Sequence, residues 1–158
     1  MLVRLFRSFL PCLLLLSLAA CGPTYRGYQK KPYTVRGQRY YPMTPQQALG
    51  FREEGMASWY NEHVFLWFGG KTSLGEPFKA RAMAGAHKTL PLPCRVRVTN
   101  LKNGKSCIVR LNDRGPFVGN RILDLTPKAA SRLGFKQSGV ARVAIEVLSV
   151  GDGRWRIR

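Results

Sequence analysis

The clearest pattern in the chain is the alternation of apolar and polar residues in its second half. Residues 95–101 and 105–111 alternate on either side of Asn103-Gly104, and residues 141–147 alternate again. A period of two is typical of a strand with one buried face, and Asn-Gly between two such runs is the strongest short-range signal for a β-hairpin. We therefore predict a hairpin followed later by a further half-buried strand.

The register of this hairpin follows from the position of its turn. With Asn-Gly at the centre, Val96 faces Leu111 and Val98 faces Val109 on the buried side, while the arginines of both strands point outward. The same parity places Asp113, at the end of the second strand, on the side that faces the core.

Turn-forming residues and caps outline the other elements. Residues 55–60 predict a strand, and the Gly and Pro of residues 71–78 predict a loop. Residues 126–134 predict one short helix with threonine as its N-cap, proline next and glycine at its end. Residues 155–157 predict a last edge strand. Many short strands with one or two short helices indicate a mainly β protein built on a small closed barrel.

The first 20 residues have the composition of a cleaved signal peptide. Arg4 and Arg7 precede an apolar run that is too short to span a membrane, and the stretch ends in Leu-Ala-Ala before Cys21. This ending resembles the bacterial lipobox, which implies cleavage before Cys21 and attachment of lipid to its thiol. The chain is therefore expected to be anchored in a bacterial membrane, on its periplasmic face. The absence of Asp just after Cys21 favours the outer over the inner membrane in the sorting pattern that this resemblance implies.

Composition suggests one folded domain behind this leader. The chain has 158 residues and 45% hydrophobic content, enough for one core. Residues 21–50 carry Gly and Pro among Tyr, Lys, Arg and Gln without an apolar period, so we predict a lipidated N-terminus and a flexible tether there. The domain is expected over residues 51–150, with residues 151–158 as an edge strand or tail.

The charge of the chain is strongly positive. Lys and Arg total 26 against 8 Asp and Glu, giving a formal net charge of +18. In a secreted lipoprotein this points to an anionic surface or polymer, such as lipid head groups or cell-wall carboxylates, and away from nucleic acid.

Two cysteines remain for the folded domain, Cys94 and Cys107. They have no partner Cys or His at metal-ligand spacing, so no metal site is expected. An oxidising compartment permits a disulfide between them. In the predicted hairpin Cys107 lies opposite Asn100, and Cys94 lies about 20 Å further along, whereas a disulfide needs Cα atoms about 6 Å apart. Curled strands or a longer turn would bring the two together, so both states stay open.

The candidate chemistry centres on Asp113, where an alternating strand ends and the chain turns at Gly115-Pro116. A carboxylate at a strand end meets solvent, and the neighbouring Arg114 could hold it ionised or bind an anionic or hydroxyl-rich ligand. The alternative is a strand-end aspartate that bonds turn amides beside an exposed arginine.

Five ordered motifs decide between these readings, because together they resemble the rare lipoprotein A (RlpA) family over roughly residues 54–148. They are Gly55 to Tyr60, Gly70 to Phe78, Ala86 to Pro93, Arg95 to Gly104 and Asn112 to Phe117. The resemblance implies a six-stranded double-psi β-barrel and a lytic transglycosylase of peptidoglycan. Its expected partners are glycan strands, the membrane, and possible division or cell-wall proteins, with no cofactor.

The resemblance also assigns site residues by their place in these motifs. Asp113, His87 and Glu76 are the implied catalytic positions, and Asp124 matches a further Asp of related barrel lyases. One carboxyl group can protonate the leaving oxygen and then take the proton of the muramoyl 6-hydroxyl, closing a 1,6-anhydro ring without water, and we assign this to Asp113. His87 would bond substrate, and Glu76 would position the sugar or support the transition state. The remaining expected substrate-binding residues are Trp59, Tyr60, Asn112 and Arg114.

Two departures from the family keep an alternative open. Residues 61–68 are strongly apolar where the family has a polar, Gly-rich passage, and this lip could reshape the cleft or bind membrane or a partner. The chain also ends at Arg158, so we expect no C-terminal sporulation-related domain. The alternative function is therefore a non-catalytic lipoprotein that binds peptidoglycan or loosens the wall. A purely structural scaffold for division proteins is a third possibility.

Overall fold

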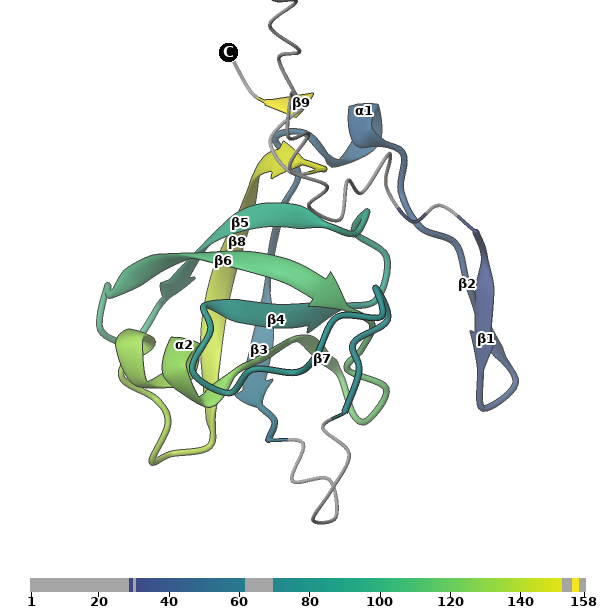
Figure 1. Cartoon of the computed structure of the whole chain (residues 1–158). Coiled ribbons are helices and arrows are strands. Elements are labelled where there is room, and N and C mark those ends of the chain that lie inside the picture. The colour runs from purple at the N-terminus through teal and green to yellow at the C-terminus, as the bar shows by residue number, and fades with distance from the viewer. Residues whose placement is uncertain (1–28, 30, 62–69, 152–154, 157–158) are drawn as a thin grey trace, which may run out of the picture.

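The computed structural model describes residues 29, 31–61, 70–151 and 155–156, and Figure 1 shows a barrel of strands with a hairpin beside it. Within these ranges, none of the helices is both long and apolar enough to cross a membrane. The predicted signal peptide, Cys21, and all but the first residue of the apolar lip lie outside the described residues.

Six strands form the barrel: β3 (Arg52–Trp59), β4 (Ala84–His87), β5 (Cys94–Asn100), β6 (Ser106–Asp113), β7 (Arg121–Leu125) and β8 (Val140–Val150). They pair in the order β3-β7-β4-β6-β5-β8, and β8 pairs back to β3 to close the barrel. The β3–β7 and β4–β6 pairs are parallel and the others antiparallel. The mainly β, six-stranded double-psi barrel predicted from the sequence is therefore confirmed.

Alternating side chains of these strands fill the barrel with apolar residues. Val96, Val98, Val109 and Leu111 are all fully buried, and Arg95 and Arg97 between them are exposed. The predicted faces of the hairpin are thus confirmed. The alternation of apolar and polar residues did not predict β4 or β7. β4 is buried along its whole length and therefore shows no alternation.

The register of the β5–β6 hairpin differs from the prediction by two residues. Val96 pairs with Val109 and Val98 with Cys107, because the loop is longer than the Asn-Gly dipeptide alone. Backbone bonds from Gly104 to Asn100 and from Asn100 to Lys105 close a wider turn. A shift of two leaves every side chain on its predicted face.

This register leaves both cysteines as free thiols. Cys94 pairs with Leu111 and Cys107 with Val98, so the two are four positions apart along the same pair of strands. At a strand rise of about 3.3 Å this separation is far beyond disulfide reach. Burial raises the pKa of the Cys94 thiol to about 12, which keeps it unreactive.

Helix α2 (Pro127–Leu133) has the predicted limits. The Thr126 side chain accepts a hydrogen bond from the Ala129 amide, and Gly134 ends the helix with φ of 78°. The last strand, β9 (Trp155–Arg156), pairs with β8 at the edge of the sheet, as predicted.

The N-terminal segment has regular structure where a flexible tether was predicted. Strands β1 (Tyr33–Val35) and β2 (Gln38–Tyr40) form a hairpin beside the barrel, and helix α1 (Pro45–Ala48) follows it (Figure 1). The tether prediction is therefore wrong for residues 33–48. The composition did not indicate this hairpin because its strands are too short to show an apolar period. A two-residue turn and stacked aromatic rings hold it instead.

Candidate active site

Strand pairing brings the ends of β4, β6 and β7 together. Ala86 pairs with Asp113 of β6 in parallel and with Asp124 of β7 in antiparallel. His87 is the next residue of β4, so three predicted site residues lie on adjacent strands of the barrel. Distant parts of the sequence meet here because β4 pairs with β6 on one side and with β7 on the other.

The Asp113 carboxylate is held by the loop between residues 70 and 78. Its Oδ1 atom accepts hydrogen bonds from the Ser73 amide at 2.8 Å, the Ser73 hydroxyl at 2.6 Å and the Arg114 amide at 2.8 Å. Its Oδ2 atom accepts a longer bond, 3.3 Å, from the Tyr60 hydroxyl. One oxygen is thus fixed by three donors, and among the described residues the other accepts from Tyr60.

Glu76, from the same loop, forms a bidentate pair with Arg110. Its two oxygens lie 2.7 and 2.8 Å from the guanidinium nitrogens, and Asn112 Nδ2 donates to it at 2.8 Å. Hydrogen bonding to Arg110, more than any other cause, lowers the pKa of Glu76 below its usual value. The group is therefore an ionised carboxylate at neutral pH.

The 70–78 loop is compact, and its turn holds Ser73 and Glu76 in place. Thr72 and Glu76 are joined by a backbone bond, and Gly75 turns the chain between them with φ of 77°. Only glycine adopts this left-handed conformation without strain. The turn presents Ser73 to Asp113 and Glu76 to Arg110.

A cavity of about 330 Å³ opens beside these groups, and we call it the Glu76 cavity. Its polar and aromatic wall comprises Tyr60, Thr72, Glu76, Phe78, Arg110 and Asn112. Two buried atoms in this wall, Thr72 Oγ1 and Asn112 Oδ1, have no hydrogen-bond partner in the part of the chain that the structure describes. Buried unpaired polar atoms are costly unless a ligand or water satisfies them, so the wall is suited to a polar ligand.

Tyr60 and Trp59 point to different parts of the molecule, as neighbours at the end of a strand do. The Tyr60 ring packs against Phe78, and its hydroxyl bonds Asp113. The indole of Trp59 packs against the core and donates to the Lys136 carbonyl at 2.9 Å. The structure therefore brings Tyr60 to the site, whereas Trp59 contacts the loop after α2.

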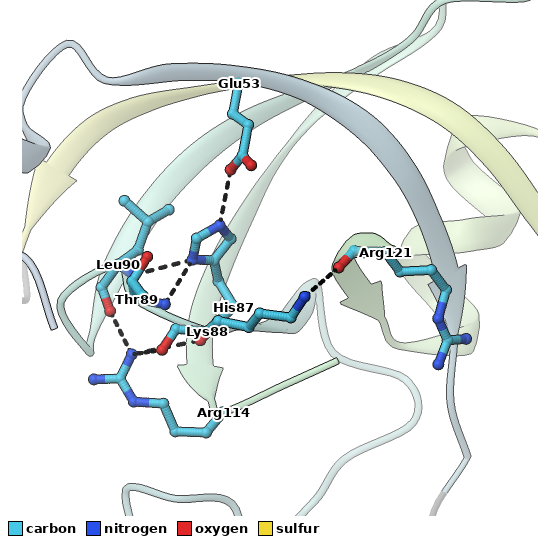
Figure 2. A network of polar contacts seen from close by, with 7 residues as sticks. All are labelled: Glu53, His87, Lys88, Thr89, Leu90, Arg114 and Arg121. Atoms are coloured by element: carbon cyan, nitrogen blue, oxygen red, sulfur yellow. Dashed lines mark hydrogen bonds and ion pairs between the residues drawn. The ribbon is translucent and has the colours of Figure 1, made fainter. Parts of the chain in front are cut away.

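His87 is buried, with only 4% of its surface exposed. Its Nδ1 atom accepts hydrogen bonds from the Thr89 and Leu90 amides at 3.1 and 3.0 Å, and Nε2 lies 3.2 Å from a Glu53 oxygen (Figure 2). Because two N–H groups point at Nδ1, the ring proton sits on Nε2 and is donated to Glu53. His87 thus supports the 87–90 turn through these bonds, and its predicted catalytic contact with substrate stays a prediction.

This burial makes His87 a source of pH-dependent stability. Burial, the largest influence, lowers the pKa of His87 below 6.5 in the folded chain, despite the opposing effect of Glu53. Below pH 6.5 His87 binds a proton in the unfolded chain more readily than in the folded chain. We expect the free energy of unfolding to fall as the pH drops below about 6.5, by up to about 1.4 kcal/mol per pH unit from this group.

Urea unfolding between pH 5 and 7.5 measures this effect. His87→Asn keeps an acceptor for the two amides and cannot titrate, so its stability should lack this part of the pH dependence. The matched control is His63→Asn, which replaces the other histidine of the sequence. An unchanged pH profile in His87→Asn would contradict the assignment.

Arg114 binds backbone carbonyls around this turn. Its Nη1 atom donates to Leu90 O at 2.6 Å and Lys88 O at 3.2 Å, Nη2 donates to Gln29 O at 3.3 Å, and the guanidinium lies 5.3 Å from the centre of the Tyr33 ring. Figure 2 shows it below the turn that His87 supports from above. Arg114 thus ties the N-terminal segment to the site, and its Nε atom is buried without a partner.

Asp124 belongs to a separate polar cluster on β3 and β7. The buried Ser58 hydroxyl donates to Asp124 Oδ1 and accepts from Arg121, whose guanidinium also lies 3.6 Å from Asp124. These contacts join the two parallel strands, and among the described residues Asp124 forms no hydrogen bond with Asp113 or Glu76. Its predicted substrate contact therefore stays a prediction.

Sequence reasoning missed two residues that shape the site. Ser73 lies in a predicted loop and gave no sign that it would bond Asp113. Arg110 was expected only to face outward, which it does, but the 70–78 loop covers it and supplies Glu76. Both depend on a loop packing against a strand 34 to 40 positions away, which local patterns do not reveal. No cluster of His, Cys, Asp and Glu fit to hold a metal ion occurs in the described part of the chain.

The chain is similar in sequence to one family of known proteins. A family model described as lytic transglycolase matches residues 52–145. The chain is 52% identical over 115 residues to the endolytic peptidoglycan transglycosylase RlpA of Pseudomonas aeruginosa, covering 73% of this chain and 32% of that protein. It is 48% identical over 126 residues to the protein of that name from Rickettsia bellii, covering 78% and 54%. The corresponding protein of Neisseria meningitidis is 51% identical over 122 residues, covering 77% and 49%. The chain thus spans about a third to a half of the length of these curated relatives.

Proposed function

Because the chain belongs to the lytic transglycolase family, we propose that it cleaves the glycan strands of peptidoglycan between N-acetylmuramic acid and N-acetylglucosamine, leaving 1,6-anhydro-muramic acid ends. The observation that carries the proposal is the setting of Asp113. One carboxylate oxygen is fixed by three donors, and the other faces Tyr60, which lines the Glu76 cavity. A carboxyl group held in this way has the position that an acid and base catalyst needs.

The first step breaks the glycosidic bond. Protonated Asp113 gives its proton to the glycosidic oxygen as the C1–O bond breaks, and the N-acetylglucosamine leaves with that oxygen as a hydroxyl group. Positive charge develops at C1 and the ring oxygen of the muramic acid, as in other reactions at glycosidic bonds.

The second step closes the anhydro ring. The 6-hydroxyl of the same muramic acid attacks C1, and the Asp113 carboxylate takes the proton from that hydroxyl. This restores protonated Asp113 and consumes no water. The same group acts as acid and then as base, so a second catalytic acid is not required.

Glu76 supports this reaction as an ionised group. Its lowered pKa excludes it as the proton donor at neutral pH, and its pairing with Arg110 fixes Asn112 at the cavity wall. The unpaired Asn112 Oδ1 is an acceptor suited to the N–H of an acetamido group, which every sugar of the strand carries. Glu76 and Asn112 therefore position the sugar while Asp113 transfers protons.

Product analysis in ¹⁸O-water tests the proposal. The purified full chain is incubated with glycan strands, and the new ends are identified by mass. We expect 1,6-anhydro ends without ¹⁸O, because the internal hydroxyl replaces water as nucleophile. New reducing ends labelled with ¹⁸O would mean a hydrolase and would contradict the lytic mechanism.

The alternative, a non-catalytic wall-binding lipoprotein, predicts a different result in the same experiment. Glycan strands would sediment with the protein and remain uncut. The polar lining of the Glu76 cavity suits sugar binding in either case, so the products, and not binding, separate the two functions.

We also propose that Cys21 is the lipidated N-terminus, which would hold the domain on the periplasmic face of a membrane, with the outer membrane favoured over the inner. The support is the Leu-Ala-Ala-Cys ending of the leader and its lack of a following Asp. Mass analysis of the N-terminal peptide, with Cys21→Ser as the control, would show whether acyl chains are attached. Possible division or cell-wall proteins as partners remain part of this proposal.

A further inference from the structure

A second cavity lies on the other flank of Asp113, and its volume is about 310 Å³. We call it the N-terminal cavity, because the segment before and within β1 forms one wall. The residues used below are Gln29, Lys31, Tyr33, Ser73, Arg114 and Phe117. No residue of this wall before Ser73 belongs to the part of the chain that the family model matches.

The Asp113 carboxylate connects the two cavities. Its Oδ1 atom accepts from Ser73, which lines the N-terminal cavity, and its Oδ2 atom accepts from Tyr60, which lines the Glu76 cavity. A polymer bound across Asp113 would therefore extend from one cavity into the other.

Unpaired polar atoms mark both cavities in the same way. Four buried side-chain atoms have no hydrogen-bond partner among the described residues. Thr72 Oγ1 and Asn112 Oδ1 belong to the Glu76 cavity, and Gln29 Oε1 and Arg114 Nε belong to the N-terminal cavity. Since such atoms normally find partners, their restriction to these two walls points to a polar ligand at each.

The N-terminal cavity carries two cations, Arg114 and Lys31, and the Asp113 carboxylate interacts electrostatically with the first of them. Arg114 bonds backbone carbonyls, and among the described residues no acidic side chain forms an ion pair with it. Lys31 at the rim is exposed and adds a second cation. An anionic group on the ligand would meet both.

Aromatic rings give this cavity a stable wall. The Tyr33 and Tyr40 rings stack at 5.2 Å, and Phe117 packs against both from the loop after Asp113. The Tyr33 hydroxyl also donates to the Lys88 carbonyl at 2.6 Å, so the hairpin is fixed to the 87–90 turn. The wall is thus a built part of the site.

We propose that the N-terminal cavity is a second sugar subsite that binds a muramyl residue of the strand through a carboxylate. This is the carboxylate of the lactyl group where no stem peptide is attached, or one of the peptide's own carboxylates where the lactyl group is amide-linked to a stem peptide. The inference rests on the proposed function for the identity of the polymer. Of the two sugars in the strand, muramic acid alone carries a carboxylate, which matches the cations at this cavity. N-acetylglucosamine offers no such group.

Two ligands of equal length test this by calorimetry. A muramyl tetrasaccharide without stem peptides carries lactyl carboxylates, whereas chitotetraose has the same N-acetylated sugar backbone without them. The full chain with Asp113→Asn is the parent protein, so that neither ligand is cut. A third ligand with stem peptides shows whether a carboxylate of the peptide replaces the lactyl one.

Substitutions at Lys31 give a graded expectation, because the residue is exposed and its replacement leaves the fold intact. Lys31→Ala should raise the Kd for the muramyl tetrasaccharide about fivefold, the range of one exposed charge contact. Lys31→Glu should raise it further, and Lys31→Arg should restore it. The Kd for chitotetraose should stay unchanged throughout.

Arg39→Ala is the matched control, since it removes an exposed cation from the hairpin that follows Lys31, at a position outside the cavity. An equal loss in Arg39→Ala would mean general charge attraction and would overturn the subsite. Equal binding of the muramyl ligand by all Lys31 variants, or no binding of it at all, would also overturn it. The Lys31 pattern in a chain that fails to cut glycan would refute the proposed activity and leave the subsite standing. Cleavage of glycan with no effect of the Lys31 substitutions on binding would support the proposed activity and refute the subsite.

Discussion

Asp113→Asn is expected to lower the rate of 1,6-anhydro end formation by about 10³-fold. The amide oxygen can still accept the Ser73 and Arg114 amides, so the strand end should keep its place. An amide can neither protonate the leaving oxygen nor take the proton of the 6-hydroxyl. The measurement is the initial rate of anhydro-end release from purified glycan, with products counted by mass.

Glu54→Gln is the control for this substitution. Glu54 is an exposed carboxylate on β3 that pairs with Arg142 at 3.6 Å, and its change to an amide should leave the rate unaltered. Sedimentation with glycan should be retained by Asp113→Asn. A variant that binds glycan and still cuts it at the parent rate would remove Asp113 from the mechanism.

Gly85→Ala is expected to destabilise the fold by about 3 kcal/mol. Gly85 lies between β6 and β7, and a Cβ atom there would come within 2.7 Å of the Asp124 carbonyl oxygen and 2.9 Å of Leu125 Cδ2. The first of these is backbone and cannot move without breaking the β4–β7 pairing. Urea unfolding at pH 7.5 measures the loss as a lower midpoint.

Ala84→Gly, in the same strand, separates this clash from ordinary strand effects. Ala84 is buried, and its replacement removes a methyl group and adds chain entropy, which together cost about 1 kcal/mol. A Gly85→Ala variant no less stable than Ala84→Gly would show that the strands can separate to admit a methyl group. The positions of Ala86 and His87 would then be less rigid than their pairing suggests.

Elements with local signals were predictable from the sequence. Helix α2 begins and ends at its predicted residues because threonine, proline and glycine act within a few positions of each other. The faces of β5 and β6 were also predictable, since a period of two fixes them whatever the turn. The register was not, because turn length depends on how Asn100 and Lys105 bond across it.

The candidate site was predictable as a set of residues but not as an arrangement. The motif resemblance named Glu76 and Asp113, and the structure places both around one loop. It could not show that His87 would be buried against Glu53, or that Arg114 would bond carbonyls. Those outcomes depend on burial and on segments far away in the sequence, including Gln29.

The order of the N-terminal segment changes how far the domain can travel from its anchor. Gln29 is already bonded to the barrel through Leu92, so seven residues, 22–28, separate Cys21 from this attachment, a span of eight Cα-to-Cα steps, and not the whole of 21–50. With lipid on Cys21, as proposed, a fully extended chain of that length reaches about 28 Å. The domain would then work within roughly its own diameter of the bilayer. It would act on the layer of glycan nearest the membrane and could not reach the wall beyond it.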